Sequence, residues 1–415
     1  MTHVPEPLFI DPIPKGVAPA TLFTPARVEE ASELLHAGAS RRATVAFTGA
    51  KTKADWGAPL EDTDMQMSTT ALAELISYHP GDMTAAVGAG LPLARLQPML
   101  AEHGQWLALD PATEEAGATL GGLLATGDAG PRRLRYGTMR DLTIGTTLVL
   151  ADGTVVHSGS HVIKNVAGYD LSKLFLGSLG SLGLIAEIIV RLHPRPAASR
   201  TVMAAASVGQ ARAATAELRS CGVEPAAIEW FGQVSAHPPQ GSLLVRLEGG
   251  QAGVDAGSSR VIQLLRTLDL DADTLDGEAA EQWWTRCAQA GLGVPGGSVA
   301  RIGTLPTKLD QTVRAMAAAA DSHGLAATLT SSTALGLHTA ALTGNSAAQA
   351  AVLLQWRTAV QHLGGTLTLR RRPPAVTAAV DAYGQTPSSV AYLRAVKNQL
   401  DPDHRCSPGR FPAWT

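Results

Sequence analysis

Three glycine-rich segments lie between residues 48 and 183, each beside a pattern typical of a strand or short helix. They are Gly49–Thr52, Ala118–Gly127 and Gly177–Gly183. Glycine lets backbone N–H groups point together at an anion without a Cβ in the way. None of the three contains the P-loop string, so an NTPase of that type is excluded. We predict that the loops line one site. The alternative is that they are ordinary tight turns, and it is strongest for the third, where Leu179 and Leu182 have a core pattern.

A fourth strand–glycine–helix passage imitates a dinucleotide fingerprint. Gly88 and Gly90 follow a strand, but Leu93 stands where G-x-G-x-x-G needs its third glycine. We interpret both glycines as turn residues and Pro92 as the first-turn proline of a helix.

The helix caps, the strand and helix patterns and a Pro-rich linker predict an α+β chain in two domains. A helix over 25–38 has Thr24 as its N-cap, Pro25 at its first position and Gly38 at its end. Other expected helices cover 93–102, 119–125, 171–176, 210–220, 309–322 and 391–400, and expected strands cover 44–47, 84–87, 143–150, 155–157, 184–192, 242–247 and 298–305. The Pro-rich stretch 194–199 is the expected linker, which gives domains 1–195 and 196–385 and a C-terminal segment 386–415.

Composition excludes several classes of protein. The formal net charge is −3, with 33 basic and 36 acidic residues and no long basic run, which argues against nucleic-acid binding. The three cysteines, Cys221, Cys287 and Cys406, are far apart and form neither a disulfide framework nor an iron–sulfur motif. Residues 1–10 lack a signal-peptide h-region, and no apolar run approaches a membrane span. We therefore expect a cytoplasmic protein, with a peripheral place at the inner face of the membrane as the alternative.

The glycine segments belong to longer strings that resemble a known family. These strings are Ala118–Thr126, Gly130–Gly137 with Asp141, and Asn165–Asp170 with Lys173–Gly183. They are similar to the FAD-binding domain of the vanillyl-alcohol oxidase superfamily, the PCMH-type fold. Within it the chain looks most like the E-type FAD-binding chains of bacterial glycolate oxidase, rather than the larger D-type chains. Leu400–Pro402 with Ser407–Phe411 also resembles the superfamily's closing signature.

This resemblance implies a fold and a cofactor site. The fold would be a PCMH-type domain of two α+β subdomains, then an α+β cap, with a C-terminal segment that returns to the flavin domain. FAD would lie against these residues: Thr48, Gly49, Ala50, Lys51, Thr52, Thr119, Gly121, Gly122, Thr126, Asp128, Ile185 and Arg410. The first loop lacks the histidine that covalently flavinylated relatives carry, so we expect noncovalent FAD.

The sequence departs from the family pattern in two places. Ala50 and Lys51 interrupt a loop that is usually richer in glycine, and Asp128 stands where the family carries asparagine. An anionic side chain beside a diphosphate is unfavourable unless it faces a donor, so a role for Asp128 beside the phosphates is unexplained.

Oxidation of a 2-hydroxy acid needs a cation for the carboxylate and a base for the hydroxyl proton. Arg370 is the expected cation, and His338 and Tyr169 are the expected bases, although His338 lies in an apolar stretch and Tyr169 could simply order its loop. Further candidates are Arg371, Arg410, His362 and His404. No H-x-x-H cluster occurs, so no catalytic metal is expected.

Three functional hypotheses follow. The first is the FAD subunit of a glycolate-oxidase-type complex, with a second flavoprotein subunit and an iron–sulfur subunit as partners. The second is a self-sufficient FAD oxidase or dehydrogenase of a small alcohol or 2-hydroxy acid. The third is a structural subunit with weak flavin binding.

Overall fold

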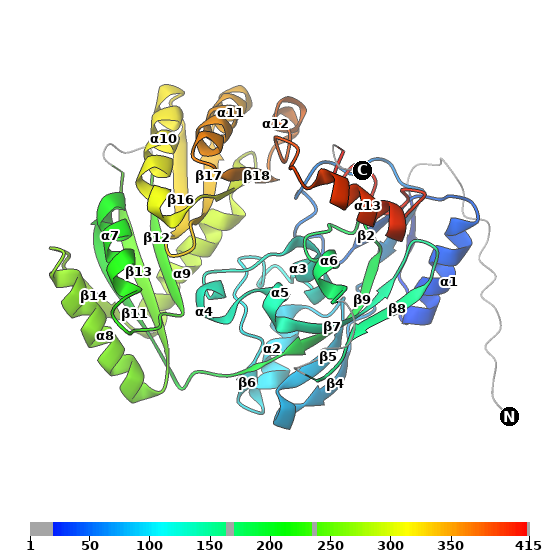
Figure 1. Cartoon of the computed structure of the whole chain (residues 1–415), viewed down its shortest axis with the longest axis horizontal. Coiled ribbons are helices and arrows are strands. Elements are labelled where there is room, and N and C mark those ends of the chain that lie inside the picture. Colours follow the sequence, from blue (N-terminus) through cyan, green and yellow to red (C-terminus); the bar gives the residue numbers. More distant parts are fainter. Residues whose placement is uncertain (1–19, 163–169, 235–238, 413–415) are drawn as a thin grey trace.

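The structure, a computed structural model, describes residues 20–162, 170–234 and 239–412. Two lobes are visible in Figure 1, each built on its own β-sheets. Residues 20–194 form the N-terminal lobe, and residues 198–371 form the cap lobe. The chain then returns, and helix α13 (Val390–Leu400) lies on the N-terminal lobe (Figure 1). This arrangement of layers is the predicted α+β architecture.

The N-terminal lobe contains a parallel three-stranded sheet and an antiparallel five-stranded sheet. The first has the order β1 (Thr21–Phe23), β3 (Met65–Ser68), β2 (Val45–Thr48). The second has the order β4 (Leu75–His79), β5 (Thr84–Gly88), β9 (Leu184–Arg191), β7 (Thr143–Val149), β8 (Val155–Gly159). The lobe's helices are α1 (Val28–Ala39), α2 (Leu93–Ala101), α3 (Leu120–Thr126), α4 (Arg133–Tyr136), α5 (Met139–Leu142) and α6 (Ser172–Phe175), and β6 (Gln105–Trp106) pairs with β10 (His193–Pro194).

Strand β9 joins the two cores of this lobe. Its Ile188 and Val190 pack with Leu93, Leu96 and Leu100, the buried stripe of α2 at i, i+3 and i+7 spacing. Its Leu184 and Ala186 pack instead with α1, β2 and β3. The glycine-rich turns at the ends of β2 and β9 are therefore held on a rigid scaffold.

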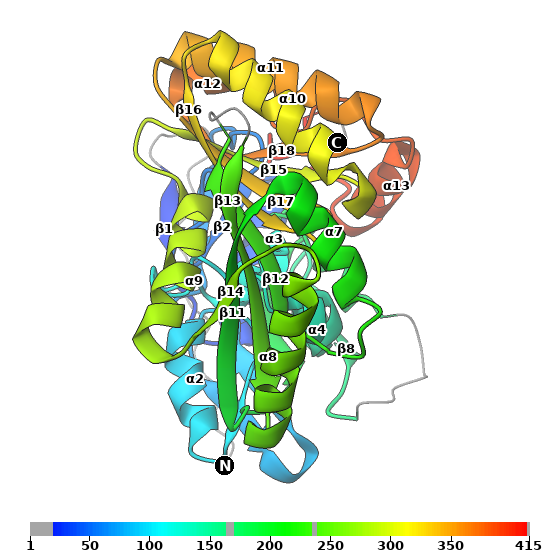
Figure 2. The ribbon, with the colours of Figure 1, turned by 90° about the vertical axis from the view of Figure 1, so that its left-hand side faces the viewer.

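The cap lobe is one antiparallel eight-stranded sheet. Its order is β14 (Ala272–Leu275), β11 (Ala198–Ser207), β13 (Gln240–Gly249), β12 (Ala227–Gln233), β16 (Ala326–Ser332), β17 (Leu337–Thr343), β15 (Ser298–Gly303), β18 (Thr366–Arg371). Its helices are α7 (Val208–Leu218), α8 (Gln251–Arg266), α9 (Gly277–Leu292), α10 (Leu309–Ser322) and α11 (Ser346–His362), and α12 (Pro374–Ala379) follows the sheet. Helices α7, α8, α10 and α11 share the main core on one face, whereas α9 packs on the other through Trp284 and Cys287 (Figure 2). Helix α9 and the strands beside it therefore face the N-terminal lobe.

The C-terminal segment is fastened to the N-terminal lobe by buried polar groups. Lys397 Nζ donates to Ser181 O at 2.7 Å and to Asp401 Oδ2 at 2.5 Å. Arg405 donates to the carbonyls of Leu35, Ala43 and Ala151. The segment thus connects the third glycine loop to α1 and to the start of β2.

The local structure differs from expectation at the first helix and agrees with it at the turn after β5. The first helix begins at Val28 with Arg27 as its N-cap, so the prediction of Thr24 and Pro25 was wrong. Glu30 accepts a hydrogen bond from Ala26 N at 2.8 Å, and Arg27 has an extended backbone. Gly88 ends β5 and begins a turn that contains Gly90, because Leu91 N donates to Gly88 O at 3.0 Å, and a Cβ at either glycine would lie within 2.3 Å of a carbonyl oxygen in segment 69–72.

Candidate functional site

The three glycine-rich loops meet at one cavity of about 670 Å³, the glycine-loop cleft. Its wall contains every expected cofactor residue except Asp128: Thr48, Gly49, Ala50, Lys51, Thr52, Thr119, Gly121, Gly122, Thr126, Ile185 and Arg410. Gly180 and Gly183 of the third loop line it as well. The predicted convergence of the loops is therefore present in the fold.

Close backbone approach explains two of these glycines. A Cβ on Gly49 would lie 2.5 Å from Thr119 Oγ1, and a Cβ on Gly121 would lie 2.7 Å from the Cβ of Ala89. Thr119 also caps α3, because its Oγ1 accepts from Gly122 N at 3.3 Å. The first two loops thus touch one another, and a larger residue would push them apart.

The third loop contributes one residue to the core and others to the cleft. Leu182 is buried in the core of the lobe, as its pattern suggested. Leu179 differs from that expectation, since it takes a positive φ of 51° and lines the cleft. Gly180 also has a positive φ, 78°, and a Cβ there would lie 2.9 Å from Ser407 Oγ of the C-terminal segment.

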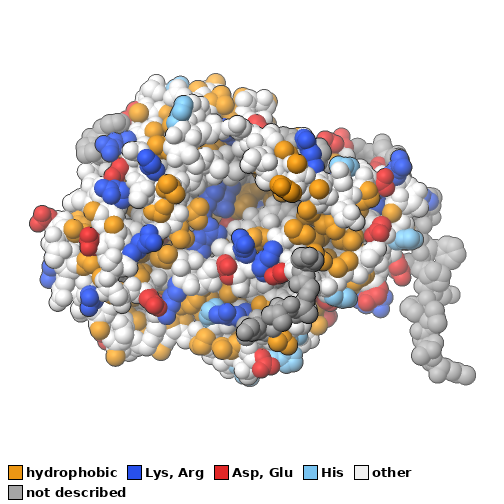
Figure 3. All heavy atoms as spheres, viewed as in Figure 1, with side chains coloured by type: hydrophobic (Ala, Val, Ile, Leu, Met, Phe, Trp, Pro, Cys, Tyr) orange, Lys and Arg blue, Asp and Glu red, His pale blue; other side chains and the backbone are white. Residues whose placement is uncertain are grey.

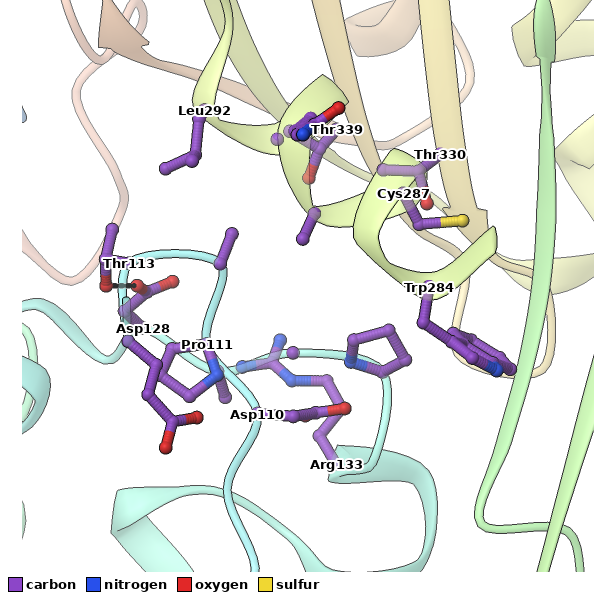
Figure 4. A pocket seen from close by; sticks show the side chains of 18 of the residues that line it. Asp110, Pro111, Thr113, Asp128, Arg133, Trp284, Cys287, Leu292, Thr330 and Thr339 are labelled. Carbon is purple, nitrogen blue, oxygen red and sulfur yellow. Dashed lines mark hydrogen bonds between the residues drawn. The ribbon is translucent and has the colours of Figure 1, made fainter. Parts of the chain in front are cut away.

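A second cavity of about 280 Å³, the arginine cavity, lies where the cap meets the N-terminal lobe. Figure 3 shows Lys and Arg side chains gathered in the hollow between the lobes. In Figure 4, Trp284, Cys287 and Leu292 come from α9 on the cap side, and Asp110, Asp128 and Arg133 come from the N-terminal lobe. Thr52 and Asp55 line both cavities, so the arginine cavity adjoins the glycine-loop cleft.

Six arginines line this cavity: Arg132, Arg133, Arg246, Arg301, Arg370 and Arg371. Four are paired: Arg132 with Glu248 at 2.8 Å, Arg246 with Glu281 at 3.0 Å, Arg371 with Asp55 at 3.3 Å and Arg370 with Asp128 at 3.6 Å. Within the described ranges, Arg133 and Arg301 have no carboxylate within ion-pair distance, and Arg133 Nε is buried without a hydrogen-bond partner. Arg301 Nη1 donates to Thr339 Oγ1 at 2.8 Å, and the remaining N–H groups of the two guanidinium groups are available for an anionic ligand.

The crowding of cations shows in their pKa values. Burial lowers the pKa of Arg301 to about 9, and the charges of Arg370 and Arg133 act in the same direction. Burial also lowers the pKa of Arg370 to about 10, although Asp128 opposes that shift. All three remain protonated at neutral pH, so a bound anion would relieve their mutual repulsion.

A buried carboxyl group lies beside Arg301. Glu229 of β12 is 3% exposed, and its Oε2 accepts from Thr330 Oγ1 at 3.0 Å. Burial raises the pKa of Glu229 to about 7, while the charge of Arg301 acts in the opposite direction. A carboxyl group with a pKa near neutrality in a cavity is suited to accept or donate a proton.

The structure separates the expected catalytic residues. Arg370 lines the arginine cavity and stacks over Trp56 at 3.8 Å. His338 lines neither cavity: it is fully buried in the cap, its ring nitrogens contact Ser331 Oγ and Thr304 Oγ1, and burial lowers its pKa to about 3. Tyr169 lies outside the described residues. His362 and His404 are exposed and line neither cavity.

Asp128 also differs from its expected place, since it lines the arginine cavity rather than the cleft. There it faces donors: Thr113 Oγ1 at 3.0 Å, Lys53 Nζ at 3.9 Å and Arg370. The positive charges of Lys53 and Arg370 therefore balance the carboxylate of Asp128. Because Asp128 lies outside the cleft, it does not place a negative charge on the wall expected to bind the diphosphate.

Sequence reasoning missed Arg133, Arg301 and Glu229. Arg301 and Glu229 occur singly in apolar strand patterns, Ser298–Gly303 and Ala227–Gln233. A lone charge inside a buried strand was the available signal, because it needs a partner or a ligand. No group of three or more His, Cys, Asp or Glu side chains among the described residues is arranged to hold a metal ion.

Comparison with known proteins identifies the cofactor. Residues 19–159 match the family model described as "FAD binding domain". The chain is 32% identical over 224 residues to the glycolate oxidase subunit GlcE of Escherichia coli (strain K12), covering 54% of this chain and 61% of that protein. It is 32% identical over 220 residues to a probable mitochondrial D-lactate dehydrogenase of Danio rerio, covering 52% and 44%. The chain thus matches about half of these relatives' length.

A solved alkyldihydroxyacetonephosphate synthase structure aligns with a TM-score of 0.70 at 16% identity, covering 93% of this chain and 76% of that one. This likeness extends through both lobes and confirms the predicted fold class. With the family match, it also confirms the resemblance read from the glycine strings. The N-terminal lobe carries an FAD-binding domain, and FAD is the cofactor.

The cleft itself fits FAD. Gly49 and Gly121 let the segments of its wall pack closely, with no Cβ in the way. Thr48 Oγ1 is buried on the cleft wall and has no hydrogen-bond partner among the described residues, so it is free to donate to a ligand. Lys51, Lys53, Arg372 and Arg410 supply positive charge along the same wall, which suits a diphosphate.

Proposed function

We propose that this chain is an FAD-dependent oxidoreductase that oxidises a small 2-hydroxy acid in the arginine cavity. The observation that carries the proposal is the position of two guanidinium groups without carboxylate partners, Arg133 and Arg301, in a described cavity that adjoins the FAD cleft. A planar guanidinium matches a carboxylate in two parallel hydrogen bonds. The names of the relatives, a glycolate oxidase subunit and a D-lactate dehydrogenase, point to the same class of substrate.

Each cavity residue has a distinct task in this proposal. Arg133 and Arg301 bind the carboxylate, and Arg370 adds positive charge while Asp128 holds it in place. Glu229, as the carboxylate, accepts the proton of the substrate hydroxyl. Bound FAD supplies the acceptor for the hydride that leaves the adjacent carbon, so the product is a 2-oxo acid. Helix α9 and the cap strands cover the cavity and limit the access of water.

We further propose that the chain works as the FAD-binding subunit of a complex and passes its electrons to a partner. Cys287 and Cys406 are buried in different lobes, and Cys221 is half-buried elsewhere in the cap, so these cysteines cannot gather around an iron–sulfur cluster. An electron-transfer cluster would therefore belong to another subunit. A self-sufficient dehydrogenase is the second candidate, because one chain here supplies both the flavin site and the anion site.

The test is anaerobic reduction of the purified FAD-loaded chain by glycolate or D-lactate, followed through the loss of blue flavin absorbance. Removing a charge-assisted donor costs about 1.5–3 kcal/mol, so Arg301→Met should lower kcat/KM by about 10- to 150-fold. Arg314→Met, on the exposed side of α10, is the matched control and should leave the rate unchanged. Equal rates for Arg301→Met and wild type would refute the anion site. Full turnover with a soluble acceptor and no other subunit would refute the relay to a partner.

A further inference from the structure

Lys53 occupies the wall between the two cavities. Its side chain is almost fully buried, and it lines the glycine-loop cleft. Nζ donates to Thr113 Oγ1 at 3.0 Å and to Thr52 Oγ1 at 3.2 Å, and it lies 3.9 Å from Asp128 Oδ2. Thr113 and Asp128 both line the arginine cavity. The ammonium group is therefore inserted from the cleft toward the site where the proposed oxidation takes place.

The other cations of the cleft either bind backbone carbonyls or are exposed. Arg410 donates to the backbone carbonyls of Ala54, Trp56 and Ala58, which fixes the loop that carries them. Arg372 likewise donates to the carbonyls of Gly57 and Asp55. Lys51 is exposed. Among the described cations of this wall, Lys53 is the buried one held by hydroxyl groups, at the boundary with the arginine cavity.

In the proposed reaction, the end of FAD at this boundary would be its redox-active ring. A hydride passes only between groups in contact, so the ring must adjoin the cavity that holds the hydroxy acid. Lys53 lines the cleft, but its hydroxyl partners Thr52 and Thr113 line the arginine cavity, so its ammonium group lies at that junction. This step rests on the proposed function, because it uses the arginine cavity as the substrate site.

We propose that the Lys53 ammonium stabilises the negative charge that develops on the flavin ring during reduction and so raises its reduction potential. Two electrons and one proton arrive on the ring and leave one net negative charge, while the lysine neither gains nor loses an electron or a proton. Thr52 and Thr113 orient the ammonium, and Asp128 offsets part of its charge. A charge at this place tunes the electronics of the cofactor without touching the hydroxy acid.

The surroundings make such tuning effective. Burial lowers the pKa of Lys53 to about 8, and the charge of Asp128 opposes that shift. The ammonium therefore remains mostly protonated at neutral pH in a site of low polarisability, where a nearby charge acts strongly. A new negative charge on the ring would raise the pKa of Lys53.

The test uses sulfite, which adds to oxidised flavin and leaves the ring negatively charged, together with the midpoint potential of the FAD-loaded chain. Lys53→Met should weaken sulfite binding at least tenfold and lower the midpoint potential, by about 30 mV for each tenfold in a two-electron couple. Lys53→Arg should stay near wild type, and Asp128→Asn should shift both quantities the opposite way. Arg95→Met, at an exposed position of α2 that lines neither cavity, is the matched control.

Two results would overturn the inference. One is a flavin-loaded Lys53→Met protein with wild-type sulfite affinity and potential. The other is a Lys53→Met protein that loses FAD affinity while the retained flavin keeps wild-type sulfite affinity, which would place the ammonium at the diphosphate. If Lys53→Met does not fold, Asp128→Asn still tests the inference, because it should strengthen sulfite binding and raise the midpoint potential. Neither measurement needs a hydroxy acid. If hydroxy acids did not reduce the flavin, the proposed function would fail, but sulfite binding could still depend on Lys53, so the two failures are distinguishable.

Discussion

Replacing Lys397 by methionine should detach the C-terminal segment from the FAD-binding lobe. Lys397 is 4% exposed and donates to Asp401 Oδ2, Ser181 O and, at 3.3 Å, Cys406 O. Asp401 is fully buried and also accepts from the backbone N–H groups of Arg405 and Cys406. Lys397→Met therefore leaves a buried carboxylate without its counter-charge, which costs about 3–5 kcal/mol when one partner of a buried pair is removed.

The assay is urea unfolding of the FAD-free chain, followed by fluorescence and by circular dichroism. The double variant Lys397→Met/Asp401→Asn should recover part of the loss, because the orphaned charge is gone. Asn398→Ala, at an exposed position on the same helix, is the control and should change stability by no more than about 0.5 kcal/mol. Because Ser181 belongs to the third glycine loop, Lys397→Met should weaken FAD binding as well. A free energy of unfolding within about 1 kcal/mol of wild type would refute the reasoning.

Two more predictions concern the cavities. The rate of flavin reduction should rise with pH through about 7, because Glu229 must be ionised to accept a proton and burial raises its pKa to about 7. Glu229→Gln should lower the rate and abolish this rise in the pH–rate profile. An unchanged profile would exclude Glu229 as the proton acceptor. Gly49→Ala should weaken FAD binding at least tenfold, because its Cβ would lie 2.5 Å from Thr119 Oγ1; flavin fluorescence quenching measures the affinity. The control is Gly81→Ala, whose Cβ would meet no atom within 4 Å, and it should bind FAD like wild type.

The FAD cleft could be predicted from the sequence because its information is local. Glycines near the ends of strands and helices mark places where the backbone approaches a ligand or another segment, and Gly49, Gly121 and Gly180 all do so. The strand and helix periodicities that carry these loops were also readable, as for β9 and α2, with boundaries shifted by one or two residues. The start of α1 was the larger miss, since a local hydrogen bond to Glu30 outcompeted the Thr–Pro cap signal.

The arginine cavity could not be predicted in the same way, because its residues come from elements that are distant in sequence. Arg133 is on a short helix of the first lobe, Glu229 and Arg301 are on separate cap strands, and Arg370 is near the end of the sheet. Which strand faces meet across the lobes depends on strand order and register, which no local pattern encodes. A histidine is a natural choice of base when only residue types are visible. His338 instead lies between two hydroxyl groups inside the cap, whereas Glu229 is among the carboxyl groups that line the cavity.

The position of Asp128 shows how the two cavities depend on one another. Its carboxylate is shared by Thr113, Lys53 and Arg370, so it links a cation of the FAD cleft to a cation of the arginine cavity. Neutralising this group would leave Lys53 and Arg370 facing one another without a counter-charge, and the charge of Arg370 already contributes to lowering the pKa of Lys53. Binding of a carboxylate near Arg370 would compete with Asp128 for that guanidinium and leave more of the aspartate's charge to Lys53. Occupation of the substrate site should therefore lower the flavin's sulfite affinity even where the two ligands do not overlap, and a 2-oxo acid that left sulfite affinity unchanged would show that the cavities are electrostatically independent.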